Sequence, residues 1–202
     1  AVQQRFQLLR DLRSAIDNDE FELFYQPQID LATRAPLGLE ALIRWRHPQR
    51  GLLTPDAFWN ALQHKKLSAT LGEWVIEEAC RTIRLWQGTA LNGMRLAINI
   101  SAEQVARTNV AELVMRALWK HGVQPHLLEL EMTESLLMLD VNTAKVMLHT
   151  LKDAGITLAI DDFGVAYASM TNLMQLSVDC LKIDRSFIAQ IPANERARRL
   201  VE

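Results

Sequence analysis

The chain alternates short apolar segments, each long enough for one strand, with longer segments that carry helix signals. Six segments predict strands: 21–27 (FELFYQP), 36–45 (PLGLEALIRW), 94–101 (MRLAINIS), 127–134 (LLELEMTE), 157–163 (TLAIDDF) and 178–184 (VDCLKID). Strands that alternate with helices form a parallel sheet, either open and doubly wound or closed into a barrel. No glycine-rich phosphate loop follows the first strand segment, which counts against a nucleotide-binding open sheet. We therefore predict an α/β barrel.

Three sequence signals predict where helices begin and end. Residues 54–56 (TPD) supply an N-cap residue, a proline at the first helical position and an acid in the first turn. Ser101 and Gln104 have the spacing of a capping box. The segment 141–155 (VNTAKVMLHTLKDAG) predicts a helix that stops at its final glycine. The buried stripe of that helix is predicted to contain Val146, Leu148 and Leu151.

The composition is that of an ordinary globular protein, with 49% hydrophobic and 23% charged residues in 202. A formal net charge of −2 gives no basis for binding a nucleic-acid polymer or an anionic membrane. Cys80 and Cys180 lie far apart without metal-binding spacing, so we expect reduced core residues in a cytoplasmic protein. No apolar run approaches the roughly 18 to 20 residues of a membrane span, and no signal peptide opens the chain.

Polar residues recur near the C-terminal ends of the predicted strands. They are Glu40, Asn99, Glu131, Asp161, Asp162 and Lys182. In a parallel barrel these strand ends open on one face, where the active site lies. Carboxylates gathered there repel one another unless cations or protons neutralise them. Oxygen ligands without His or Cys select Mg²⁺ or Mn²⁺ over zinc, so the pattern predicts a site for a hard divalent ion.

The adjacent carboxylates of Asp161 and Asp162 could each hold a different ion. Two-metal sites, with ions about 3.5–4 Å apart, favour phosphoester hydrolysis because they stabilise the attacking and leaving oxygens. Lys182 would hold the attacking water or stabilise developing negative charge. A single acid at a strand end is more often a helix cap or an ion-pair partner. The residues alone also leave open an enolase-like barrel, which combines carboxylates, Mg²⁺ and a lysine.

Six motifs occur in order along the chain. They are YQPQ (25–28), EALIRWRHP (40–48), NIS (99–101), EMTES (131–135), DDFG (161–164) and LKIDRSF (181–187). This ordered set resembles EAL domains, the bacterial phosphodiesterases of cyclic di-GMP, and EALIRWRHP resembles the family signature. The resemblance implies a TIM-like barrel whose first strand runs antiparallel to the rest. It also implies hydrolysis of cyclic di-GMP to linear pGpG by a two-metal mechanism with Mg²⁺ or Mn²⁺.

The resemblance assigns a role to each matching residue. The implied metal ligands are Glu40, Asn99, Glu131, Asp161 and, for the second ion, Asp162. Lys182 matches the lysine that orders the nucleophilic water, and Glu134 matches a glutamate that braces the loop after the aspartate pair. Arg44 matches an arginine that contacts a substrate phosphate. Gln26 lies in a motif that lines the substrate cleft; the alternative interpretation is a polar residue at the strand end, on the rim.

The chain departs from the family pattern after DDFG. Residues 165–169 read VAYAS, where members usually have Thr-Gly-Tyr-Ser-Ser. This change removes the backbone freedom of a glycine and a hydroxyl that would serve Glu134. In the family this loop supports the second metal and a dimer contact. Since both aspartates remain, the change is either tolerated drift or the mark of a degenerate EAL domain. Such a domain, the alternative to an enzyme, would act as a cyclic di-GMP receptor or a regulatory interaction module.

A second departure concerns length. The chain ends soon after the predicted strand 178–184, before the strands that carry the family's Ala-Glu-Gly-Val-Glu and Gln-Gly motifs. We expect a single EAL domain over residues 1–202 that lacks its last two strands. A homodimer and a fused upstream sensor or diguanylate cyclase domain are further partners consistent with the resemblance. The segment 5–16 is either a connector to such a domain or the first helix of this one. We expect a cytoplasmic protein, or the cytoplasmic part of a membrane-anchored one.

Overall fold

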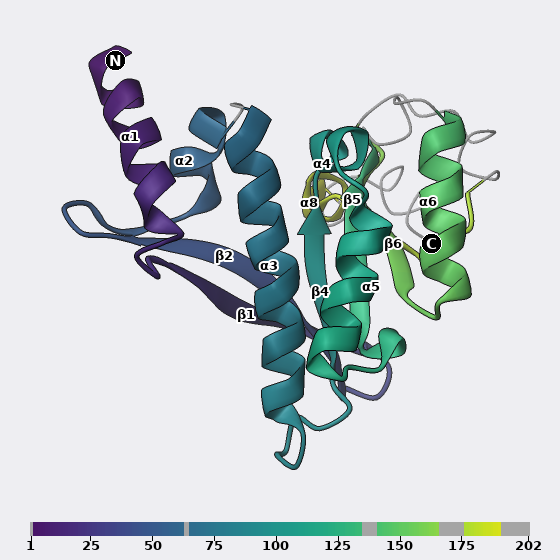
Figure 1. Cartoon of the computed structure of the whole chain (residues 1–202). Coiled ribbons are helices and arrows are strands. Elements are labelled where there is room, and N and C mark those ends of the chain that lie inside the picture. The colour runs from purple at the N-terminus through teal and green to yellow at the C-terminus, as the bar shows by residue number, and fades with distance from the viewer. Residues whose placement is uncertain (1, 63–64, 135–140, 166–175, 191–202) are drawn as a thin grey trace. The chain divides into compact units, whose positions relative to one another are not determined.

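A computed structural model of the chain describes residues 2–62, 65–134, 141–165 and 176–190 (Figure 1). The chain forms two compact units. The first unit comprises Ala1–Ile98 and Glu112–Leu128, and the second comprises Asn99–Ala111 and Glu129–Glu202. In the described part of the chain, no helix combines the length and the apolar character needed to cross a membrane.

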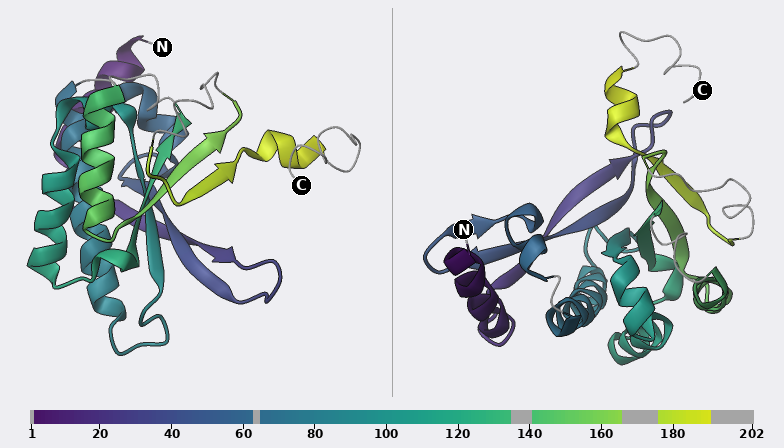
Figure 2. Two further views of the ribbon diagram at one scale, coloured as in Figure 1. Left: turned by 90° about the vertical axis from the view of Figure 1, so that its right-hand side faces the viewer. Right: turned by 90° about the horizontal axis from the view of Figure 1, so that it is seen from above.

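The first unit is built around a long two-stranded ribbon (Figure 2). Its strands are β1 (Phe21–Ile29), β2 (Pro36–His47), β3 (Gly51–Leu53) and β4 (Arg95–Ile100), of which β4 continues past the unit boundary. β1 and β3 pair antiparallel with β2, whereas β4 pairs parallel with it. The predicted antiparallel first strand is confirmed. β3 was not predicted, because three residues are too few to show a period of two.

Among the residues described for this unit, four α-helices and one short 3₁₀ helix accompany these strands. They are α1 (Val2–Ala15), α2 (Pro55–Leu62), α3 (Lys65–Trp86), α5 (Val110–His121) and η1 (Pro125–Leu127). α2 begins at Pro55, as the capping signal predicts. α3 and α5 are joined by ion pairs one helical turn apart, Glu73 with Arg116 and Glu77 with Lys120. Because i and i+4 residues share a helix face, these pairs hold the two helices alongside each other.

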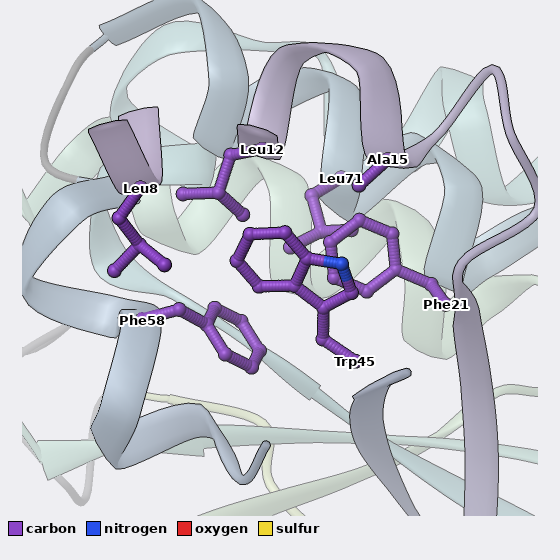
Figure 3. Close-up of a cluster of buried hydrophobic side chains, with 7 residues drawn as sticks. All are labelled: Leu8, Leu12, Ala15, Phe21, Trp45, Phe58 and Leu71. Atoms are coloured by element: carbon purple, nitrogen blue, oxygen red, sulfur yellow. The ribbon is translucent and has the colours of Figure 1, made fainter. Parts of the chain in front are cut away.

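One cluster of buried hydrophobic side chains in this unit has seven members (Figure 3). Its members are Leu8, Leu12, Ala15, Phe21, Trp45, Phe58 and Leu71. The ring centroids of Phe21 and Trp45 lie 5.6 Å apart, and Phe58 meets Trp45 edge-on at 5.7 Å. The Trp45 indole N–H donates to Glu20 Oε2 at 2.9 Å, which satisfies the polar atom of this buried ring. α1 contributes three members, so the segment 5–16 packs as a helix of this unit.

The part of the second unit that the structure describes contains three parallel strands and three helices. They are α4 (Ala102–Arg107), β5 (Leu128–Thr133), α6 (Val141–Asp153), β6 (Thr157–Phe163), β7 (Cys180–Ile183) and α8 (Arg185–Gln190), where β5 starts one residue before the unit boundary. β6 pairs parallel with both β5 and β7. The capping box is confirmed, since Ser101 Oγ accepts the Gln104 N–H at 3.2 Å and Gln104 Oε1 accepts the Ser101 N–H at 2.9 Å. All six predicted strands are present.

Two burial predictions are wrong. Val146 is 69% exposed, whereas Leu148 and Leu151 are buried as expected. Residues 146 and 148 lie two positions apart, about 200° around a helix, so they cannot share one stripe.

Cys180 lies exposed on β7, although Cys80 is buried in α3; both thiols are free, as predicted. Burial raises the pKa of the Cys80 thiol to about 12, which leaves it unreactive.

Candidate active site

In the first unit, the predicted residues lie on one face of the β1–β2 ribbon. The antiparallel register places Gln26 opposite Glu40 and Glu22 opposite Arg44. All four positions are even-numbered, and successive side chains of a strand point to opposite faces. Gln26, Glu40 and Arg44 therefore share a face of the ribbon.

The opposite face of the ribbon carries the residues that pack against helices. Trp45 lies in the buried cluster, and the Tyr25 hydroxyl lies 3.1 Å from Thr82 Oγ1 of α3. Burial, as the largest influence, raises the pKa of Tyr25, so this hydroxyl stays protonated and available for the hydrogen bond. One face is thus fixed by packing on helices, and the face with Glu40 and Arg44 points away from them.

Glu40 does not lie at the end of its strand, which corrects the sequence-based placement. β2 continues seven residues further, to His47. Glu40 lies instead within Gly38–Ala41, the stretch of β2 that pairs parallel with β4, and it is in register with Ala97. Asn99 follows two residues later on β4, with an exposed side chain. The later part of β2 pairs with β3 instead of β4, a change of partner that no local pattern reveals.

The guanidinium of Arg44 is positioned by a backbone carbonyl and an aromatic ring. Its Nη1 donates to the Ile43 carbonyl at 2.8 Å, and its Cζ lies 5.5 Å from the centroid of the Phe24 ring. Glu22 is in register with Arg44, yet its Oε1 lies 2.6 Å from Nη2 of Arg46. Within the described part of the chain Arg44 forms no ion pair, so its charge is available to an anion.

In the second unit, a buried ion pair joins two of the predicted residues. Glu131 on β5 has no exposed side-chain surface, and its Oε2 lies 2.6 Å from Lys182 Nζ on β7. A buried carboxylate is costly unless a cation or hydrogen bonds compensate it. Lys182 supplies that cation while one quarter of its own side chain remains exposed.

The aspartate pair lies at the irregular end of β6. Asp161 is in register with Thr133 of β5, but the register with β7 shifts between Ile160 and Phe163. Asp162 has a φ of +53°, in the left-handed region that aspartate tolerates better than most residues. The shift and the left-handed turn interrupt regular strand alternation at these two carboxylates.

Negative charge is concentrated around Asp162. Partial burial, followed by the carboxylates of Asp161 and Asp184, raises the pKa of Asp162. Lys182 and Arg185 partly oppose this effect. A carboxylate whose ionisation is disfavoured by like charges is one that a bound cation would relieve.

Glu134 and Gly164 fix the start of the loop after the aspartate pair. Glu134 is buried, and its Oε2 accepts the Gly164 N–H at 3.2 Å. Gly164 has a φ of +99°, and a Cβ built there would lie 2.9 Å from Cε2 of Phe187 on α8. Only glycine meets both conditions. Of the altered loop, Val165 is exposed, and residues 166–169 lie outside the described part of the chain.

The sequence analysis missed three residues that lie beside predicted site residues, one in the first unit and two in the second. Asp184 caps α8, because its carboxylate accepts the Ser186 N–H at 2.9 Å. Aspartate is a preferred residue at the N-cap of a helix, so the sequence alone could have indicated this cap. The contacts of Phe187 with Gly164 and of Phe24 with Arg44 join residues about twenty positions apart, so no local pattern could reveal them.

The chemistry of the predicted ligands fits a hard divalent ion. All are carboxylate or amide oxygens, and negative charge accumulates around Asp162. Among the described residues, however, no three His, Cys, Asp or Glu side chains gather closely enough to hold a metal. The Lys182 ammonium instead compensates the Glu131 carboxylate.

Comparison with known proteins identifies the family. The EAL domain family model matches residues 9–202. The chain is 42% identical over 191 residues to the Pseudomonas aeruginosa protein named bifunctional diguanylate cyclase/cyclic di-GMP phosphodiesterase MucR, covering 94% of this chain and 28% of MucR. It is 39% identical over 199 residues to cyclic di-GMP phosphodiesterase NbdA of the same organism, covering 98% of this chain and 25% of NbdA. The chain thus spans about a quarter of the length of these relatives.

A solved structure described as the PaMucR phosphodiesterase in complex with c-di-GMP matches with a TM-score of 0.90 and 39% identity. The match covers 96% of this chain and 79% of the solved one. Because the match covers 96% of this chain, the likeness extends over both units. The chain therefore has the TIM-like α/β fold of EAL domains and belongs to the EAL domain family.

Proposed function

We propose that the chain is a metal-dependent cyclic di-GMP phosphodiesterase that releases linear pGpG. The observation that carries this proposal is the buried Glu131–Lys182 pair on β5 and β7, with Asp161 and Asp162 on the strand between them. Such a set of carboxylates and one ammonium suits a reaction in which negative charge develops on phosphate oxygens. The names of MucR and NbdA support the same reaction and substrate.

The residues divide into three roles. Mg²⁺ or Mn²⁺, two ions in this proposal, would be held by Glu40, Asn99, Glu131, Asp161 and Asp162. When bound, the ions supply Lewis-acid activation of water and phosphate. Lys182 orients the attacking water through its ammonium, and Arg44 binds a phosphate oxygen with its guanidinium. Gln26 lies opposite Glu40 and contributes a neutral polar group at the substrate.

Glu134 is a positioning residue in this scheme. Its hydrogen bond to the Gly164 N–H fixes the backbone two residues after Asp162. Such supporting contacts hold a catalytic group within a fraction of an ångström of its working position.

A second function is a cyclic di-GMP receptor or regulatory module without turnover. It is favoured by the change to VAYAS at residues 165–169, which follows Asp161 and Asp162 directly. A receptor would keep the Arg44 and Gln26 contacts and lose productive metal binding.

The test is chromatographic detection of pGpG after incubation with cyclic di-GMP and Mn²⁺, together with equilibrium binding of the nucleotide. We expect the unaltered chain to form pGpG and Glu40→Ala to lower turnover more than about a hundredfold, with an unchanged circular dichroism spectrum. Glu22→Ala is the matched control, because Glu22 lies on the same face of the ribbon but pairs with Arg46. Normal turnover in Glu40→Ala would show the metal assignment to be wrong. Binding without product, both in the unaltered chain and in a chain extended by its native residues to the usual length of the domain, would identify a receptor.

A further inference from the structure

Phe24 is an aromatic side chain that the helical core does not use. It lies on the face of the ribbon that carries Glu40 and Arg44, and it is 40% exposed. The neighbouring apolar side chains of β1, Phe21 and Leu23, point the other way and are buried. Phe24 thus presents a ring among polar groups, at the position where the register pairs it with Leu42.

Arg44 keeps its positive charge beside this ring. Its Cζ lies 5.5 Å from the ring centroid, a cation–π distance. Its Nη1 is bonded to the Ile43 carbonyl, and the nearest acid in register, Glu22, is engaged by Arg46. The guanidinium is therefore restrained at the ring and retains donors for an anion.

An exposed aromatic surface next to an available guanidinium matches the two parts of a nucleotide. The base of a nucleotide offers a planar π-face, and the phosphate beside it is an anion. Aromatic side chains bind bases by stacking, and arginine binds phosphate oxygens through its planar fork of N–H donors. A carboxylic or purely apolar ligand would use only one of these two groups.

We propose that Phe24 is a base-stacking residue, on which one purine of a cyclic dinucleotide lies while Arg44 binds the adjoining phosphate. This inference rests on the proposed function and adds to it a substrate-binding residue that holds the base. Phe24 contributes to affinity and leaves the chemical step to the carboxylates and Lys182.

The test measures binding and turnover in Phe24→Leu, Phe24→Trp and the control Leu37→Ala, an exposed apolar residue elsewhere on the same ribbon. Binding of cyclic di-GMP is measured by calorimetry in EDTA, and KM and kcat are measured with Mn²⁺. Phe24→Leu should raise the Kd and the KM about tenfold and leave kcat within about twofold. Phe24→Trp should restore both constants and show quenching of its fluorescence by the stacked base. Leu37→Ala should match the unaltered chain.

A double-mutant cycle separates stacking from mere support of Arg44. If the ring stacks on a base, Phe24→Leu weakens binding by a similar factor in the Arg44→Ala background. If the penalty vanishes in that background, the ring only holds the arginine and the inference is wrong. Equal affinity of Phe24→Leu and the unaltered chain would also overturn it, while leaving the phosphodiesterase proposal intact. Absence of both binding and turnover in the unaltered chain would overturn the proposed function and this inference together.

Discussion

The two units hold their predicted site residues by different physical means. In the first unit, Arg44 is followed by Trp45, whose buried ring anchors β2 in an aromatic cluster. In the second unit, Glu131 and Glu134 are fixed by polar contacts, one with the Lys182 ammonium and one with the Gly164 N–H. Apolar packing is insensitive to charge and to bound ions, whereas a set of close carboxylates responds to both. We therefore expect the first unit to be sensitive to lost volume and the second to changes of charge and backbone.

The largest effect on stability is expected from Trp45→Ala. Its ring is completely buried between Phe21 and Phe58, so truncation should lower the free energy of unfolding by about 3–5 kcal/mol. Trp119→Ala is the control, because Trp119 on α5 is 87% exposed, and it should change stability by less than about 0.5 kcal/mol. Urea unfolding followed by circular dichroism measures both variants. An equal loss of stability in the two variants would show that the aromatic cluster around Trp45 does not stabilise the fold more than an exposed tryptophan does.

Lys182→Met tests how much the buried ion pair with Glu131 contributes to the stability of the second unit. It leaves the Glu131 carboxylate buried without its cation, which should cost about 3 kcal/mol of stability. Lys120→Met removes an ion pair of similar length, 2.9 Å to Glu77, at an exposed position, and should cost about 1 kcal/mol or less. Urea midpoints at equal slope give the two values. If the free energy of unfolding falls by the same small amount in both variants, the Glu131–Lys182 pair contributes no more to stability than a surface ion pair.

Gly164→Ala tests whether the loop after Asp161 and Asp162 needs a glycine at this position. A positive φ costs a non-glycine residue about 1–2 kcal/mol, and the new Cβ would also displace the Phe187 ring. Gly88→Ala is the matched control, since Gly88 has a φ of +78° and nothing within 4 Å of the added Cβ. We expect Gly164→Ala to be the more destabilising of the two and the only one to reduce turnover. Turnover equal to that of Gly88→Ala would show that the loop tolerates displacement.

The smallest effect is expected from Asp162→Asn, and it depends on pH. The folded-state pKa of Asp162 is raised, so the folded chain binds this proton more tightly than the unfolded chain does. Stability from this group is therefore present at acid pH and is lost as pH rises through the raised pKa. Asparagine removes the charge and tolerates the left-handed φ, so the variant should be slightly more stable than the unaltered chain at pH 7.

Thermal unfolding in EDTA between pH 4.5 and pH 8 measures this difference. The advantage of Asp162→Asn should shrink toward the acid end of the range. An advantage that is constant with pH would mean that Asp162 does not experience the repulsion of Asp161 and Asp184.

The sequence by itself determined the features that depend on neighbours along the chain. The six strands, the start of α2, the Ser101–Gln104 capping box and the stop at Gly155 all follow from short-range periodicity and capping chemistry, and the structure confirms them. The motifs also identified the family, because their order along the chain is itself a sequence property.

Only the tertiary structure decided which side chains meet. The pairing of β2 with β4 and then β3, the Lys182–Glu131 ion pair and the contact of Phe187 with Gly164 join residues distant in sequence. The exposure of Cys180 likewise depends on what covers β7, because an apolar residue type shows a preference for burial but not the neighbours that provide it. Local propensity acts over a few residues, whereas contacts across strands depend on register and packing of the whole fold.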